Sequence, residues 1–286
     1  ETQIEIEKNF ERLEVAKNAL IESVGLDKSK KILIIRDETS NPISADILKS
    51  AAKELGAEIE EIFLDKKTTR KKVQKFLSPS MAVINLTDGY HPALDQIFDD
   101  DLDEYQFRLL HLADLGPEAM DKNGAISENI EEMEMRMNKM ENELNKAEGF
   151  RITSTYGTNL EIKLRMAKER AWAKESGRLQ DGKWGNLPAG EIFTTPDEYK
   201  INGVLVLPIL DSDISDYQGV DEFVRVNIKD GAITSIEGGE SARIMRKKLQ
   251  KDMQVELDDK KILFMFYELP NWLLVQTVKL VAKPLI

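Results

Sequence analysis

The residues whose types and spacing best suit a functional site form one short stretch in the second half of the chain, Trp184-Gly185-Asn186-Leu187-Pro188-Ala189-Gly190-Glu191. Two glycines and a proline fix a rigid turn, because proline restricts φ and glycine adopts conformations that other residues avoid. The carboxylate of Glu191 leaves this turn at the start of an expected strand over residues 191–195. The sheet would then set the direction of the carboxylate, as a preorganised site requires.

We expect structural or surface roles for the other residues that could carry out chemistry. The chain has two histidines, His91 and His111, and we expect both to be structural or surface groups. The acidic run over residues 99–104 lacks the glycine and terminal glutamate of a calcium loop, so it is expected to be a solvated surface. The absence of cysteine excludes disulfides and thiolate zinc sites. No glycine-rich nucleotide-binding loop is present, so no nucleotide cofactor is expected.

The stretch that ends at Glu191 resembles the Gly-Asn-Leu-Pro-Ala-Gly-Glu signature of the aminopeptidase T family of metallo-aminopeptidases. The resemblance extends to about Leu269 through four further segments, residues 51–57, 156–160, 202–206 and 229–242. On these segments the chain is identified as a member of that family.

The resemblance implies a metal-dependent aminopeptidase that holds divalent metal ions (zinc, cobalt or manganese) and releases N-terminal residues from peptide substrates. It implies that Glu191 and Glu268 are metal ligands, and it leaves the catalytic residues unknown. The family's other ligands lie in later segments that have no counterpart before Ile286. The resemblance therefore implies a chain truncated at its C-terminus with impaired chemistry. A change of reading frame near Asn271 and Trp272 is one hypothesis for this ending.

Two other functions stay open at this point. The first is a non-catalytic remnant with the same fold, which binds peptide or dimerises. The second is a mononuclear iron dioxygenase, because a dihydroxypyridine-cleaving branch resembles this family. Metal analysis separates the three. Zinc, cobalt or manganese with peptide hydrolysis supports the aminopeptidase, iron supports the dioxygenase, and absence of both metal and activity supports the remnant. We expect a homodimer.

Hydrophobic patterning predicts an α/β fold with two domains. Expected strands at residues 31–35, 58–64, 81–86 and 108–113 alternate with helical patterns, which is typical of a parallel sheet wrapped by helices. A methionine-rich helix over residues 127–148 precedes a half with antiparallel hairpins, one of them turning at Asp230-Gly231. We therefore predict an N-terminal α/β domain over residues 1–149 and an α+β domain over residues 150–286 that carries the metal site.

Composition limits the classes of partner. Forty basic against 52 acidic residues give a net charge of −12, which disfavours nucleic acid and anionic membranes as partners. A hydrophobic content of 41% is typical of a globular protein with a core. The longest apolar runs are too short to span a bilayer, and the first residues show no secretory signal. We therefore expect a cytoplasmic protein.

Overall fold

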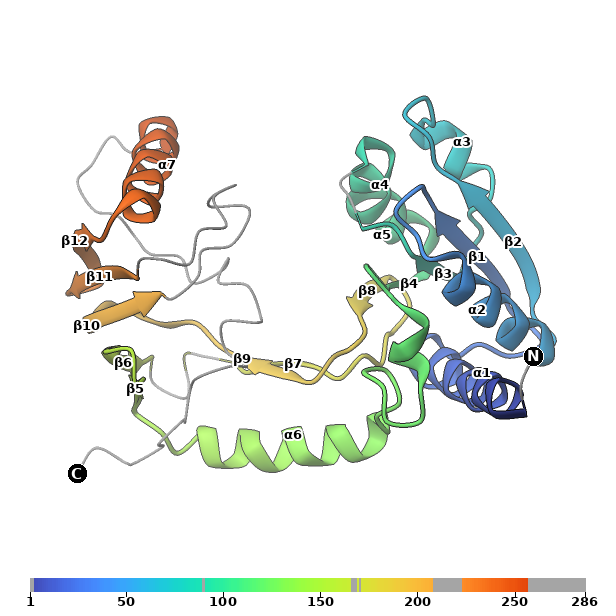
Figure 1. Ribbon diagram of the computed structural model, residues 1–286, viewed down its shortest axis with the longest axis horizontal. Helices are drawn as coiled ribbons and strands as arrows, with labels where there is room; N and C mark the ends of the chain where they lie inside the picture. Colours follow the sequence, from blue (N-terminus) through green and yellow to red (C-terminus); the bar gives the residue numbers. More distant parts are fainter. Residues whose placement is uncertain (1–2, 89–90, 166–168, 170, 208–222, 257–286) are drawn as a thin grey trace. The chain divides into compact units, whose positions relative to one another are not determined.

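The structure is a computed structural model that describes residues 3–88, 91–165, 169, 171–207 and 223–256. The chain divides into two compact units (Figure 1). The first comprises residues 1–139 and 174–192, and the second comprises residues 140–173 and 193–286. Each unit is built around its own five-stranded sheet.

The first unit contains a parallel sheet. Its strands lie in the order β2 (Glu58–Phe63), β1 (Lys31–Arg36), β3 (Ala82–Asn85), β4 (Arg108–His111) and β8 (Lys183–Asn186). All four strand pairs are parallel. The central strands are buried on both faces, which explains their continuous runs of isoleucine, leucine and valine.

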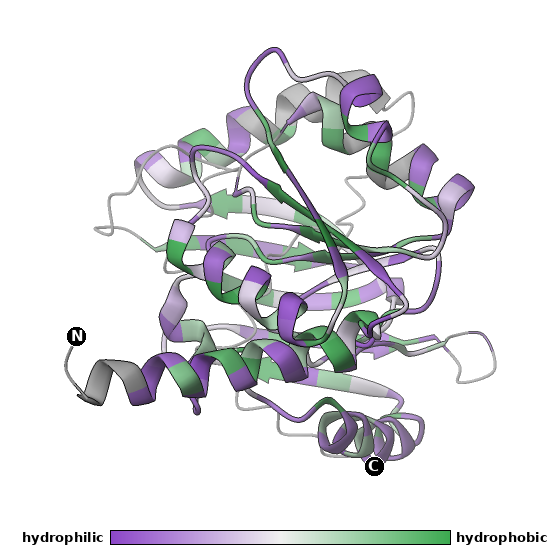
Figure 2. Ribbon diagram, turned by 90° about the vertical axis from the view of Figure 1, so that its right-hand side faces the viewer, coloured by the Kyte–Doolittle hydropathy of each residue, from purple (hydrophilic) through white to green (hydrophobic). Residues whose placement is uncertain are grey.

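Helices cover both faces of this sheet, and Figure 2 shows its apolar strands between them. On one face α1 (Gln3–Val24) and α2 (Pro42–Glu54) pack on alternate strand residues such as Ile32, Ile34 and Ile84. The opposite face holds a second core with Leu33, Val83, Leu109 and Phe107. Four short helical segments lie on that side, namely α3 (Arg70–Gln74), α4 (Pro92–Gln96), the π-helix η1 (Ile97–Asp101) and α5 (Leu102–Tyr105).

Local sequence explains where these helices begin. Asn41 precedes Pro42 in α2, and its side-chain oxygen accepts hydrogen bonds from the backbone N–H groups of Ile43 and Ser44. This is a standard N-cap followed by proline at the first helical position. A 3₁₀-helix, η2 (Pro117–Met120), and α6 (Ile130–Leu144) follow β4 in the chain.

The second unit contains an antiparallel sheet in the order β12 (Ala232–Glu237), β11 (Val224–Lys229), β10 (Pro196–Leu207), β6 (Asn159–Leu164) and β5 (Gly149–Thr153). The β11–β12 hairpin turns at Asp230 and Gly231, both with positive φ, as the Asp-Gly signal predicts. Helix α7 (Glu240–Glu256) packs on this sheet through Ala242 and Met245. A further two-stranded sheet joins β7 (Ala173–Glu175) and β9 (Glu191–Phe193), and most of its residues belong to the first unit.

The predicted fold class is confirmed: a parallel α/β sheet and an antiparallel α+β part are both present. The division into domains 1–149 and 150–286 stays a prediction, because the two compact units do not show which segments fold independently. No helix within the described ranges is long and apolar enough to cross a membrane. The strand expected over residues 261–267 lies outside the described residues.

The expectation that residues 99–104 form a solvated surface is wrong at Asp101. Its side chain is fully buried and accepts two hydrogen bonds from Arg70, at 2.6 and 3.0 Å, and one from Gln74 at 2.8 Å. The buried carboxylate therefore ties η1 to α3. Charge patterning alone could not show this, because the arginine lies about thirty residues earlier in the chain.

Candidate functional site

A row of polar side chains lies at the carboxyl edge of the parallel sheet. Asn85, His111 and Asn186 are the last residues of β3, β4 and β8, and they occupy the same register position. Residues in register on parallel strands point to the same face, so the three side chains form a continuous row. In open α/β sheets, ligands bind at this edge of the strands.

Asn85 is the centre of a buried hydrogen-bond network. Only 1% of its surface is exposed, and its neighbour Thr87 is fully buried. The Asn85 Oδ1 atom accepts from the backbone N–H of Thr87 at 3.2 Å and from the Thr87 hydroxyl at 3.0 Å. The Asn85 Nδ2 atom lies 2.7 Å from His111 Nδ1. Both ends of the amide therefore have partners, as a buried polar group requires.

The surroundings of His111 favour its neutral imidazole over the charged one. Burial lowers its pKa, because desolvation disfavours the charged ring, while the charge of Asp88 acts weakly in the opposite direction. His111 is half-buried at the end of β4. A neutral imidazole at this position can serve as a hydrogen-bond partner for a ligand without adding a charge.

The loops after β1 and β3 are fastened to each other beside this row. The hydroxyl of Ser40 donates to the Leu86 carbonyl at 3.0 Å, and the backbone N–H of Asp88 donates to Thr39 Oγ1 at 3.0 Å. Asp37 in turn accepts from the Thr39 hydroxyl at 2.6 Å. Strand β1 lies between β2 and β3, so the chain order reverses here, and such switch points are where open sheets bind ligands.

The other histidine, His91, has a structural role. Its Nδ1 atom accepts from the backbone N–H of Ala93 at 3.2 Å and caps α4. Its Nε2 atom lies 3.0 Å from the carbonyl oxygen of Asp65, which follows β2. Both ring nitrogens are therefore used within the fold, as the sequence analysis expects for this residue.

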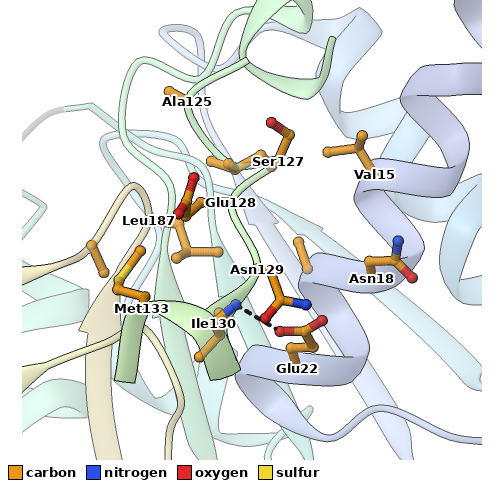
Figure 3. Close-up of a pocket in the computed structure, with 13 residues that line it drawn as sticks. Val15, Asn18, Glu22, Ala125, Ser127, Glu128, Asn129, Ile130, Met133 and Leu187 are labelled. Atoms are coloured by element: carbon orange, nitrogen blue, oxygen red, sulfur yellow. Dashed lines mark hydrogen bonds between the residues drawn. The ribbon is translucent and has the colours of Figure 1, made fainter. Parts of the chain in front are cut away.

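The signature stretch is anchored by its apolar residues. Leu187 and Ala189 pack against the core that α1 and α2 cover. They also line a pocket of about 90 Å³ with α1, the loop before α6 and Met133 (Figure 3). Across this pocket Glu22 of α1 accepts a hydrogen bond from the backbone N–H of Ile130 at 2.9 Å and so caps the start of α6.

Glu191 follows this anchored stretch as the first residue of β9 and is half-buried. Gly190 before it has φ of +119° and donates its N–H to the Glu175 carbonyl at 2.8 Å. The turn expected before Glu191 is thus present. The other expected ligand, Glu268, lies outside the described residues. The pairing of Glu191 with Glu268 at a metal therefore stays a prediction.

The described residues do not form a metal site by themselves. Nowhere in the part of the chain that the structure describes do three or more His, Asp or Glu side chains gather in a way that could hold a metal ion. A transition metal normally needs at least three protein ligands with fixed geometry. Glu191 alone does not meet this requirement.

Comparisons with known proteins separate the dioxygenase from the aminopeptidase. A family model described as 2,5-dihydroxypyridine 5,6-dioxygenase matches residues 13–261. The chain belongs to this family. No curated protein sequence matches it.

Two solved structures share the fold of this family member. One is the 2,5-dihydroxypyridine dioxygenase from Pseudomonas putida KT2440, with a TM-score of 0.59 and 19% identity, covering 85% of this chain and 72% of that one. The other is AmpT from Thermus thermophilus, with a TM-score of 0.54 and 15% identity, covering 84% of this chain and 74% of that one. At these identities the likeness shows the fold alone.

The prediction of a metallo-aminopeptidase is therefore wrong, and so are the expectations of a hydrolase and protease that came with it. The resemblance to aminopeptidase T reflects a shared fold, which the likeness to AmpT supports. The dioxygenase that the sequence analysis kept as its weaker alternative is the better reading. A divalent metal remains in keeping with the family, but zinc, cobalt or manganese has no support.

Sequence reasoning missed the row of Asn85, His111 and Asn186. One signal was available, because Asn85 and His111 each interrupt an otherwise apolar stretch, at residues 81–86 and 109–113, where a polar side chain is unusual. Asn186 was quoted only as part of the signature. Its place beside His111 depends on the pairing of β8 with β4, which no local pattern indicates.

Proposed function

We propose that this protein is a ring-opening dioxygenase that acts on a hydroxylated pyridine. The observation that carries the proposal is the match of the dihydroxypyridine dioxygenase family model to residues 13–261, which includes most of both units. The polar row at the carboxyl edge of the first unit's sheet is consistent with it, since a ring that bears hydroxyl groups needs hydrogen-bond partners rather than a purely apolar pocket.

We also propose iron as the cofactor, because it is the metal that the dioxygenase reading implies. The described residues do not supply a complete ligand set. Glu191 and Glu268 stay candidates for such a set, and their role is part of this proposal.

The test is turnover of 2,5-dihydroxypyridine by protein loaded anaerobically with ferrous iron. We expect consumption of one dioxygen per pyridine, and both atoms of ¹⁸O₂ in the opened product. Protein loaded with zinc serves as the matched control, together with an assay for hydrolysis of aminoacyl anilides. Iron-loaded protein that consumes no oxygen over the background of free iron contradicts the proposal.

A further inference from the structure

The amide of Asn85 has a fixed orientation. A backbone N–H and a hydroxyl of Thr87 both point at one end of it, at 3.2 and 3.0 Å, and only an oxygen can accept them. That end is therefore Oδ1, and the opposite end, at 2.7 Å from His111 Nδ1, is the NH₂ group. An amide group has two donors on nitrogen and no acceptor there. The contact with His111 therefore requires that Nδ1 accepts.

This requirement selects one form of the ring. A neutral imidazole carries its proton on one nitrogen only, so with Nδ1 accepting the proton lies on Nε2. The other neutral tautomer and the protonated ring would both direct an N–H at the amide NH₂. Either would lose the hydrogen bond and bring two donors together in a buried network.

The selected N–H is free to meet a ligand. The ring of His111 makes no other hydrogen bond to a described residue, and its Nε2 atom is not among the buried polar atoms that lack a partner. It therefore retains contact with solvent. His91 differs, because its Nε2 atom meets the Asp65 carbonyl.

We propose that Asn85 is a positioning residue that holds His111 in the Nε2–H form and so presents this N–H to an oxygen acceptor of a bound ligand. The choice of ligand rests on the function proposed above: the acceptor would be a ring oxygen of the hydroxylated pyridine. Asn186 stands next to His111 in the row, and Trp184, which is 60% exposed, lies two residues earlier on the same face of β8. An amide and an indole beside the donor suit a planar ring that bears polar substituents.

The tautomer can be read directly by ¹H–¹⁵N NMR of the ligand-free protein labelled at histidine. The chain has only two histidines, and a His91→Gln variant assigns their signals. We expect His111 to show a protonated Nε2 and an unprotonated Nδ1 at neutral pH. A protonated Nδ1 in the neutral ring overturns the proposal, whatever the activity of the protein.

An Asn85→Asp variant tests the role of the amide. The carboxylate is nearly isosteric and still accepts from Thr87, but it can only accept from His111. We expect the ring to move its proton to Nδ1 or to become charged, with the pKa of His111 raised by about one pH unit or more. An Asn186→Asp variant is the matched control, because it adds the same charge on the neighbouring strand without the contact to Nδ1, and it should keep the Nε2–H form. If Asn85→Asp does not fold, the wild-type tautomer still decides.

The ligand is tested by titrating 2,5-dihydroxypyridine into the protein without metal or oxygen. We expect the His111 Nε2 resonance to shift while the His91 resonances stay. Saturation without a shift at His111 overturns the assignment of the ligand. The turnover assay on iron-loaded protein tests the proposed function separately, so failure of either is distinguishable from failure of the other.

Discussion

Replacing Asn85 by leucine should destabilise the first unit more than an apolar replacement of His111 or Asn186 would. The leucine side chain has a similar volume but no acceptor, so the buried N–H of Thr87 loses its partner. An unsatisfied buried donor costs about 1–3 kcal/mol, and loss of the bonds to the Thr87 hydroxyl and to His111 Nδ1 adds about 1 kcal/mol each. We therefore expect a loss of about 3–5 kcal/mol in the free energy of unfolding.

Thr87→Val is the matched comparison. It removes only the hydroxyl, and the Asn85 oxygen still accepts from the backbone N–H of residue 87. The expected loss is about 1 kcal/mol, the usual net value of one hydrogen bond. Urea denaturation followed by circular dichroism measures both variants, and the leucine variant should shift the midpoint by about 1 M. Equal losses for the two variants would refute the view that Asn85 supports a buried network.

Three further predictions concern pH and the backbone. Folding lowers the pKa of His111, so the unfolded chain binds the proton more readily than the folded protein does. The contribution of the neutral ring to stability is therefore present above about pH 6.5, the usual pKa of histidine. It is lost as the pH falls from there toward the lowered pKa of the folded state. The difference in unfolding free energy between wild type and His111→Gln should then vary with pH below about 6.5, and a constant difference would contradict this. Gly190→Ala should cost about 1–3 kcal/mol, because φ of +119° is strained for alanine and its Cβ would lie 3.1 Å from the Met133 sulfur. A melting temperature equal to that of wild type would contradict the strain expected at this turn. Gly203→Ala should be worse still, since its Cβ would lie 2.1 Å from the Asn159 carbonyl oxygen at φ of +126°, and soluble, fully folded protein would exclude this register of β10 and β6.

The iron-loaded protein offers one more test of the candidate ligand Glu191. We expect Glu191→Gln to weaken iron binding, because an amide is a poorer ligand than a carboxylate for a divalent ion. Equilibrium dialysis with ferrous iron measures the change, and Glu175→Gln, a substitution of the same kind on β7, is the control. Equal iron affinity in both variants would remove Glu191 from the ligand set.

Much of the fold follows from the sequence by itself. The apolar runs at Ile32–Ile35 and at Ala82–Ile84 are buried on both faces in a parallel sheet, as their lack of alternation predicts. Asp230 and Gly231 form the predicted hairpin turn because their backbones adopt positive φ. These features are local: a few neighbouring residues determine each of them through backbone sterics and burial. The sequence also predicted the turn before Glu191, but not the family, because a fold shared with aminopeptidase T does not fix the function.

The tertiary structure alone decided how the candidate site is assembled. Residues 183–186 contain a glycine and two exposed side chains, and nothing local marks them as a strand of the parallel sheet. They become β8 because Leu179 and Leu187 on either side pack into the core beneath α1 and α2, which holds the segment against β4. That pairing places Asn186 beside His111, and the pairing of β4 with β3 places His111 against Asn85. Such contacts join segments that are distant in the chain, so their energy arises only when the sheet has formed.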